Sequence, residues 1–204
     1  KIDAFAMYKM DLSDGAVLET GSVYVVELCE SLDLPEDISA LANPKSSPGR
    51  LDVFTRLISD GCAEFESVAA GYSGPLYAEI SPRTFAVKLR TGSRLSQLRL
   101  RRGTAQLDDT ALEALQQQKQ LVRYDNPAVY SIRDGISLSV NLVPDPKTGL
   151  VGWRARKHAA LIDVDRVGAY QAHRFWEAVR AEDLAQGGLI LNPDEFYILA
   201  SREF

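Results

Sequence analysis

Short runs of β-branched and aromatic residues, each closed by glycine or proline, recur along most of this chain. Residues 16–30 hold two such runs around a Thr20-Gly21 turn, and residues 51–58 hold another. Runs of this length, bounded by turn residues, are typical of β-strands. Residues 108–122 differ, because aspartates that can cap a helix precede leucines at near-helical spacing. The sequence therefore predicts a mainly β protein interrupted by a short helix.

The other expected elements are assigned from hydrophobic periodicity in the same way. Residues 75–81 and 85–90 are expected to form a hairpin. Residues 171–185 are expected to form a short amphipathic helix, with Phe175, Trp176 and Val179 on its apolar side. Further strands are expected at residues 94–101, 136–142, 150–164 and 188–200.

A weak internal repeat suggests how these elements are organised. Residues 15–30 align without gaps on residues 188–203, with four identities in sixteen positions and the same order of apolar run, turn, aromatic residue and apolar run. The alternative is that any two hairpins look alike. The repeat predicts three parts: the C-terminal part of a first β unit, a connector helix, and the incomplete N-terminal part of a second unit, at residues 1–103, 104–123 and 124–204. Both ends of the chain are expected to be cut.

Composition narrows the possible partners. An apolar content of 46% supports a good core, and a net charge of −5 argues against a binder of polymeric nucleic acid. A local cluster of positive charge can still hold a small anion. No apolar run approaches the ~20 residues of a membrane span, and no signal peptide is visible. With Cys29 and Cys62 expected as free thiols, the sequence predicts a cytoplasmic protein without a membrane partner.

Several catalytic classes lack their motifs here. Zinc deaminases use H-x-E and P-C-x-x-C, but this chain has only His158 and His173, neither followed by the required glutamate, and no C-x-x-C. A four-ligand zinc site therefore cannot be assembled convincingly. The phosphate-binding P-loop, the dinucleotide-binding glycine motif and the G-x-S-x-G elbow are also absent. The sequence predicts no zinc and no protein-held metal.

Residues 43–51 (NPKSSPGRL) form the most informative stretch. Lys45 precedes two hydroxyls, Ser46 and Ser47, and Arg50 follows after a Pro-Gly pair that favours a turn. Lysine and arginine supply charge for phosphate oxygens, and hydroxyls and backbone N–H groups can complete the cradle. The alternative is an ordinary solvated loop.

Two later stretches carry further candidates. Glu79 lies in an apolar strand-like segment, where a buried carboxylate is costly unless it is paired or functional. Burial would raise its pKa toward the range of a general acid or base, whereas an outward-facing glutamate would be unremarkable. Residues 89–98 read as strand, glycine turn and strand, for which a structural hairpin is the alternative.

In this order, the three stretches resemble the superfamily of deoxyuridine triphosphatases and deoxycytidine triphosphate deaminases. Its pattern comprises [RK]-S-S-x-x-R-L, G-[YW]-x-G-x-[LI] before a strand with a glutamate, and R-x-G-x-R-[LI]-x-Q-L. Here these are residues 45–51, 71–79 and 90–98. The glutamate points to the deaminase branch, and the chain resembles its long, tandem-domain bacterial type. The likeness covers residues 15–103, and residues 104–204 resemble the opening of a second copy.

The resemblance implies a distorted β barrel or jelly roll in a homo-oligomer with shared active sites. It implies hydrolytic deamination of dCTP to dUTP and ammonia, with Glu79 activating water. Ser46 and Arg50 would hold that water and orient the glutamate. Lys45 and Ser47 would contact the triphosphate with Ser46 and Arg50, and the nucleotide would arrive with Mg²⁺.

Two departures from the pattern keep other functions open. Ala69 stands where many relatives carry an aspartate, which puts triphosphate cleavage in doubt, and Lys45 replaces the commoner arginine. Asp163 and Asp165 superficially resemble that missing carboxylate but lie too early in the second copy to take its role. The alternatives are a dUTP pyrophosphatase or a bifunctional enzyme that gives dUMP, and a non-catalytic nucleotide-binding scaffold.

Overall fold

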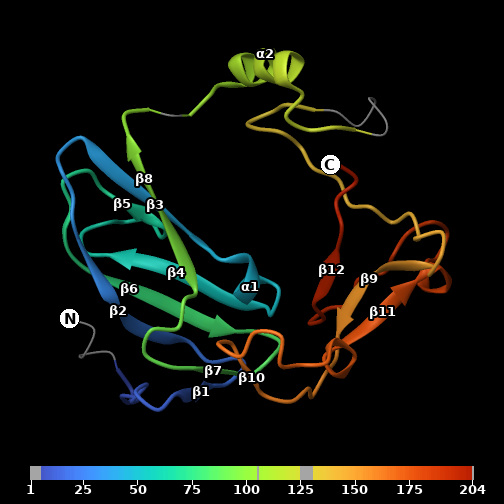
Figure 1. The fold of residues 1–204 in the computed structure, drawn as a ribbon, viewed down its shortest axis with the longest axis horizontal. Helices are drawn as coiled ribbons and strands as arrows, with labels where there is room; N and C mark the ends of the chain where they lie inside the picture. The colour runs from blue at the N-terminus through green and yellow to red at the C-terminus, as the bar shows by residue number, and fades with distance from the viewer. Residues whose placement is uncertain (1–5, 105, 125–130, 204) are drawn as a thin grey trace. The chain divides into compact units, whose positions relative to one another are not determined.

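The computed structural model describes residues 6–104, 106–124 and 131–203. Contacts divide the chain into two compact units. The first comprises Lys1–Gly103 and Lys157–Phe175, and the second comprises Thr104–Arg156 and Trp176–Phe204. The predicted mainly β fold is confirmed (Figure 1). Residues 157–175, which the sequence placed in the second unit, pack with the first.

The first unit contains an antiparallel sheet with β6 at its centre. Its order is β2 (Tyr24–Asp33), β6 (Ser73–Pro82) and β4 (Val53–Ser59). Alternate β6 residues Leu76, Ala78 and Ile80 are buried. Because successive side chains of a strand point to opposite faces, Tyr77 and Glu79 lie on the other face of this sheet. The strands predicted at residues 16–30 and 51–58 are confirmed.

A second sheet covers the buried face of the first. Its order is β5 (Ser67–Val68), β3 (Ile38–Pro44) and β8 (Ser96–Arg102) (Figure 1). One core cluster draws on both sheets: Ala40, Ala42, Leu57, Val68 and Leu76. Full burial of a side chain such as leucine contributes about 1.5–3 kcal/mol, so this cluster is a major stabilising element of the unit.

A third sheet joins distant parts of the sequence. Its order is β1 (Ala16–Leu18), β7 (Val87–Leu89) and β10 (Ile162–Asp163), and β10 runs parallel to β7. Nearby, the rings of Phe85 and Phe175 pack edge to face with centroids 6.0 Å apart. The predicted hairpin of residues 75–81 and 85–90 is wrong. The strand β7 pairs with β1 and β10, whereas β6 pairs with β2 and β4. Each of the two strands therefore has both of its edges paired in its own sheet, and they do not pair with each other.

The second unit holds a three-stranded sheet and a helix. The sheet order is β11 (Trp176–Arg180), β9 (Leu150–Ala155) and β12 (Tyr197–Leu199). The predicted helix is confirmed as α2 (Asp109–Lys119), which begins where Asp108 accepts a hydrogen bond from Ala111 N at 2.8 Å. No helix within the described residues is long and apolar enough to cross a membrane.

The helix predicted for residues 171–185 is wrong. Trp176–Arg180 forms β11, whose ladder to β9 satisfies its backbone, and single 3-10 turns flank it at Ala172–Arg174 and Ala181–Asp183. The apolar residues expected on one helix face separate, because Phe175 packs in the first unit and Val179 is buried in the second. Strand pairing at a distance thus overrides the local helical spacing.

One hydrogen bond recurs at equivalent positions of the two aligned segments. Glu19 N donates to the Tyr24 hydroxyl at 2.9 Å, and Asn192 N donates to the Tyr197 hydroxyl at 3.5 Å. In the ungapped alignment Glu19 corresponds to Asn192 and Tyr24 to Tyr197. The repeat inferred from four identities therefore has a structural counterpart, in which each tyrosine closes the turn before its own strand.

Candidate active site

The loop predicted to bind phosphate forms a single helical turn, α1 (Ser46–Gly49), between β3 and β4. Two backbone bonds shape the turn, from Gly49 N to Lys45 O at 3.2 Å and from Arg50 N to Ser46 O at 2.9 Å. Pro48 is buried, so the turn is anchored to the unit. The backbone therefore brings Lys45, Ser46, Ser47 and Arg50 together, as predicted.

The polar groups of this loop are free to meet a ligand. Ser46, Ser47 and Arg50 are exposed, and Lys45 is half-buried. Among the described residues, none of these four side chains makes a hydrogen bond or ion pair. Two positive charges without a carboxylate partner create a local potential that attracts anions despite the net negative charge.

Glu79 lies on the outer face of the β2-β6-β4 sheet. It is directly opposite Val25 on one side and Arg56 on the other, and its side chain is 17% exposed. Of the two orientations that the sequence left open, Glu79 takes the one on the outer face, although its carboxylate is largely shielded from solvent. Alternation along β6 explains this, since Ala78 and Ile80 take the inward positions.

Arg56 is the partner of this carboxylate. Its Nε and Nη2 atoms donate to Glu79 Oε1 at 3.1 and 2.5 Å. Among the described residues, Glu79 Oε2 accepts no hydrogen bond. The guanidinium also lies over the ring of Phe65 at 3.7 Å and near that of Phe54 at 5.1 Å, and both contacts favour a cation. Arg56 therefore fixes one carboxylate oxygen and leaves the other available.

Sequence reasoning missed Arg56. The residue sits in an apolar strand that was recognised correctly, but its meeting with Glu79 depends on the register of β4 against β6. The available signal was a single charged side chain inside the run VFTRLI. Arg56 alternates there with the buried residues Val53, Thr55 and Leu57. Alternation places it on the outer face, although it does not identify the partner strand.

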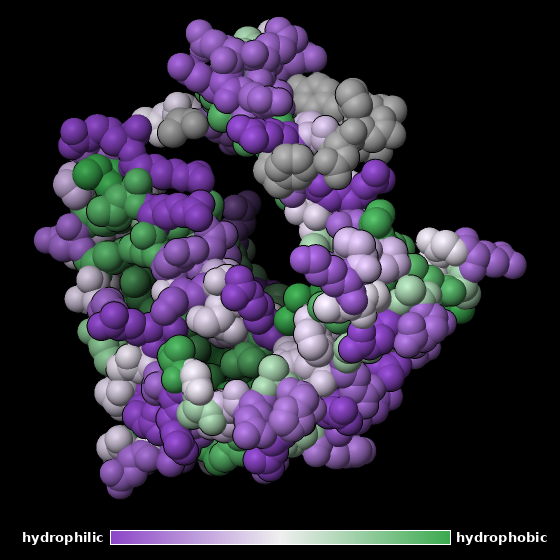
Figure 2. All heavy atoms as spheres, turned by 45° about the vertical axis from the view of Figure 1, so that its right-hand side comes forward, coloured by the Kyte–Doolittle hydropathy of each residue, from purple (hydrophilic) through white to green (hydrophobic). Residues whose placement is uncertain are grey.

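Apolar side chains also reach the surface of the first unit, as the green spheres in Figure 2 illustrate. Val23, Val25, Phe54 and Phe65 are all exposed, by 44% to 63%. Val25 lies directly opposite Glu79 in the ladder, and Phe54 lies opposite Ser81. A patch of this kind around a paired charge is typical of an interaction surface.

The two predicted halves of the site are not joined by polar contacts within the described part of one chain. Among the described residues, no hydrogen bond or ion pair joins Glu79 to Lys45, Ser46, Ser47 or Arg50. The roles assigned to these residues stay predictions. Ala69 is exposed and brings no carboxylate to its turn. The described residues also include no group of three or more His, Cys, Asp or Glu side chains arranged to hold a metal ion.

The third predicted stretch supports the first. Lys45 N donates to Leu95 O at 2.8 Å, so the turn between β7 and β8 holds the start of the loop predicted to bind phosphate. Residues 89–98 do not form a hairpin, because β7 pairs with β1 and β10 while β8 pairs with β3. The turn instead connects two sheets.

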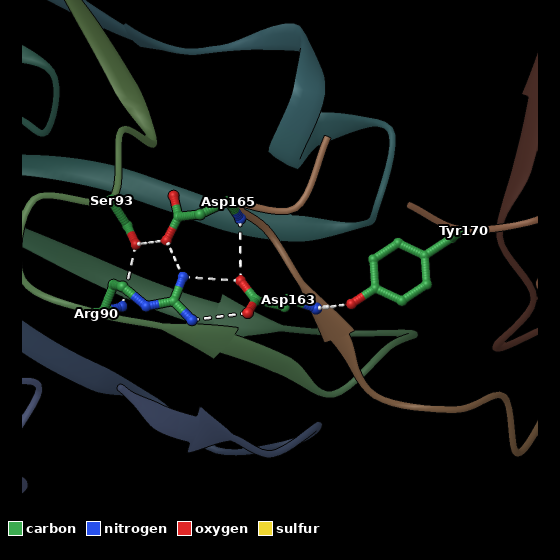
Figure 3. Close-up of polar contacts among 5 residues, drawn as sticks. All are labelled: Arg90, Ser93, Asp163, Asp165 and Tyr170. Carbon is green, nitrogen blue, oxygen red and sulfur yellow. Dashed lines mark hydrogen bonds and ion pairs between the residues drawn. The ribbon is translucent and has the colours of Figure 1, made fainter. Parts of the chain in front are cut away.

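Four polar side chains fix this turn, and we call Arg90, Ser93, Asp163 and Asp165 the Arg90 cluster (Figure 3). Arg90 donates to both oxygens of Asp163, at 2.9 and 2.7 Å, and to Asp165 at 2.7 Å. Ser93 Oγ donates to Asp165 at 2.6 Å. The hydrogen bonds from Arg90 lower the pKa of Asp163 to about 2, and both carboxylates raise the pKa of Arg90.

The chain is a mainly β protein of the deoxyuridine triphosphatase-like fold, with an exposed loop and a paired glutamate on its first unit. Two family models cover almost the whole chain: the 2′-deoxycytidine 5′-triphosphate deaminase N-terminal domain at residues 1–104 and the C-terminal domain at residues 108–204. The chain therefore belongs to the 2′-deoxycytidine 5′-triphosphate deaminase family.

A solved structure agrees with this assignment. The 2′-deoxycytidine 5′-triphosphate deaminase from Agrobacterium tumefaciens is 51% identical, with a TM-score of 0.86 over 97% of this chain. The chain spans 58% of the length of that protein. No match was found among curated proteins.

Proposed function

We propose that this protein catalyses the hydrolytic deamination of dCTP to dUTP and ammonia. The observation that carries the proposal is the state of Glu79, whose Oε1 is held by Arg56 while Oε2 remains available for a water molecule. Membership of the deaminase family and the likeness to the Agrobacterium enzyme support dCTP as the substrate.

In the proposed reaction, Glu79 removes a proton from water as its oxygen adds to C4 of cytosine. The C4–N4 bond then breaks as the amino group takes up a proton and leaves as ammonia. One water proton ends on ring nitrogen N3 and the other leaves with ammonia, so the step balances without an oxidant or reductant. A positioned carboxylate contributes about 10²–10⁴-fold to such a proton transfer.

Lys45, Ser46, Ser47 and Arg50 form the proposed triphosphate subsite. Their hydroxyl and cationic groups are unpaired within the described residues and fit phosphate oxygens. This turn offers no carboxylate, so Mg²⁺ would be held by the phosphate groups of the nucleotide. Ser46 and Arg50 are also proposed to hold the attacking water, and zinc has no part in the proposal.

A shared site between copies would bring the two halves together. The proposal places Glu79 of one copy opposite the loop of another. It is supported by the absence of hydrogen bonds and ion pairs between them among the described residues of one chain, and by the exposed apolar patch around Glu79. Phe54→Asp tests this by light scattering of the intact protein. A smaller particle with lost activity is expected, whereas an active monomer would contradict the shared site.

We also propose that the reaction takes place in the cytoplasm. The free thiols Cys29 and Cys62 are compatible with a reducing compartment.

A pyrophosphatase that gives dUMP is the second candidate, and the exposed methyl group of Ala69 disfavours it because no carboxylate is available there.

The decisive experiment follows ammonia, dUTP and pyrophosphate when dCTP is added to the intact protein. Ammonia and dUTP in equal amounts are expected, and Glu79→Gln should lower their rate at least 100-fold. Glu27→Gln is the matched control, since Glu27 is exposed on the same face of the same sheet. Full ammonia release by Glu79→Gln would refute the role of Glu79, pyrophosphate from dUTP would establish the second candidate, and binding without turnover would leave a scaffold.

A further inference from the structure

We infer that Asp163 and Asp165 are positioning residues for the triphosphate-binding loop, although they lie outside the domain that carries this loop. The family model for the first domain ends at residue 104, and both aspartates fall within the model for the second. In the structure they pack in the first unit. The inference rests on the proposed function of Lys45 and its neighbours.

The two aspartates are themselves firmly placed. Ile162 and Asp163 form β10. Ile162 N donates to Ala86 O, directly before β7, at 3.1 Å, and Val164 N donates to Lys88 O on β7 at 3.3 Å. Asp163 N donates to the Tyr170 hydroxyl at 2.7 Å, as Figure 3 shows. The segment thus has its own backbone attachment beside β7, and the carboxylates extend from that attachment toward the next turn.

The carboxylates hold both ends of a short turn. Arg90 N donates to Ser93 Oγ at 3.0 Å, and Ser93 N donates to Arg90 O at 3.0 Å. Asp163 accepts two parallel hydrogen bonds from Arg90, and Asp165 accepts hydrogen bonds from both Arg90 and Ser93. Because bidentate arginine–carboxylate pairs fix geometry as well as charge, the turn has little freedom to rotate.

The turn that begins at Arg90 also holds the loop that begins at Lys45. Two residues after Ser93, Leu95 is buried and its carbonyl accepts the hydrogen bond of Lys45 N at 2.8 Å. The next residue, Ser96, begins β8 opposite Pro44 in the β3–β8 ladder. A displacement of the turn would therefore move Leu95 and, through it, the backbone that carries Lys45. In this way two residues from the second family domain position the triphosphate-binding loop of the first family domain.

The test uses Asp163→Asn and Asp165→Asn, alone and together, in the intact protein. Because the cluster reaches the loop at Lys45, which is proposed to contact phosphate and not the attacking water, KM for dCTP is expected to rise about tenfold while kcat changes less than about threefold. Asp37→Asn is the control, since Asp37 pairs with Arg102 at 2.9 Å on the same unit but both side chains are well exposed. Its kinetic constants are expected to stay unchanged.

Hydrogen–deuterium exchange separates this inference from the proposed function. The asparagine variants are expected to exchange faster at residues 90–96 and also at residues 45–50, without nucleotide present. Faster exchange in both segments from a protein that does not deaminate dCTP would keep the coupling and refute the function. Unchanged exchange at residues 45–50, or an unchanged KM in a folded double variant, would overturn the inference. Arg90→Lys retains the positive charge but loses the two parallel hydrogen bonds to Asp163. Its KM is expected to lie between those of the wild type and the asparagine variants.

Discussion

Both hydrogen bonds that Arg56 donates to Glu79 end on the same carboxylate oxygen, Oε1. The pair bridges two neighbouring strands, with the guanidinium against the face of the Phe65 ring. Such an arrangement orients a carboxylate without occupying both of its oxygens. In the proposed reaction, the second oxygen is the one that meets water.

Replacing Arg56 should therefore affect the chemical step more than binding. Arg56→Lys is expected to lower kcat for dCTP about tenfold, and Arg56→Ala about 100-fold, because small displacements of a catalytic group are this costly. The KM should change little, since Arg56 contacts Glu79 and is not part of the proposed triphosphate subsite around Lys45. Steady-state kinetics check this, with Arg102→Lys as an exposed control. An Arg56→Ala variant with normal kcat would exclude the positioning role.

Glu66 should weaken the fold at neutral pH. Burial raises the pKa of its carboxyl, and the hydrogen bond from Leu57 N to Oε1 at 3.3 Å and the charge of Arg56 only partly oppose this shift. Among the described residues, the buried Oε2 has no hydrogen-bond partner. A raised folded-state pKa means that protonation stabilises the protein as the pH falls. Glu66→Gln is therefore expected to raise the melting temperature at pH 7 and to lose this advantage in acid. Melting curves at several pH values measure it, and a lower melting temperature at pH 7 would contradict it.

Asp163 should have the opposite pH dependence. Its pKa falls from 3.8 to about 2 when folded, mainly through its hydrogen bonds with Arg90. The stabilisation is therefore complete above about pH 4 and disappears as the pH falls toward 2. Urea unfolding of the wild type and Asp163→Asn should differ most near neutral pH and converge in strong acid. A difference that grows on acidification would show that the sign is wrong.

Gly152 should be intolerant of any side chain. It lies in β9 opposite Leu199, and an added Cβ would come 2.6 Å from Ile198 O and 2.5 Å from Leu199 Cδ2. Gly152→Ala is expected to lower the free energy of unfolding by about 1–3 kcal/mol through overpacking. Gly188→Ala is the control in the same unit, because its Cβ would meet only Ala185 O at 3.6 Å. Denaturant titrations of both variants decide the comparison.

The parts of the fold that depend on local sequence were predictable. The strands at residues 16–30 and 51–58 and the capped helix α2 follow from turn residues, β-branched runs and spacing. The hairpin at residues 75–90 and the helix at residues 171–185 were wrong for a common reason. In both cases the pairing partner lies far away in the sequence, and local periodicity carries no information about it.

The candidate site divides in the same way. The loop from Lys45 to Arg50 is a local turn, and its composition was open to both an anion site and an ordinary solvated loop until the family pattern favoured the former. Glu79 was recognised through the family pattern, but its face and its partner Arg56 depend on the register of three strands. Sequence reasoning assigned Asp163 and Asp165 no role because they lie too early in the second copy to replace the missing carboxylate. Their place beside Arg90 depends on the parallel pairing of β10 with β7, which local sequence does not show.

That parallel pairing also limits how the two halves of this protein can be separated. The family boundary falls at residues 104–108, yet the first unit takes its third-sheet strand β10 from residues beyond it. A gene divided at that boundary would yield an N-terminal fragment lacking β10 and the packing of Phe175 on Phe85. An N-terminal fragment cut at the family boundary is therefore expected to be less stable than the same residues in the intact protein.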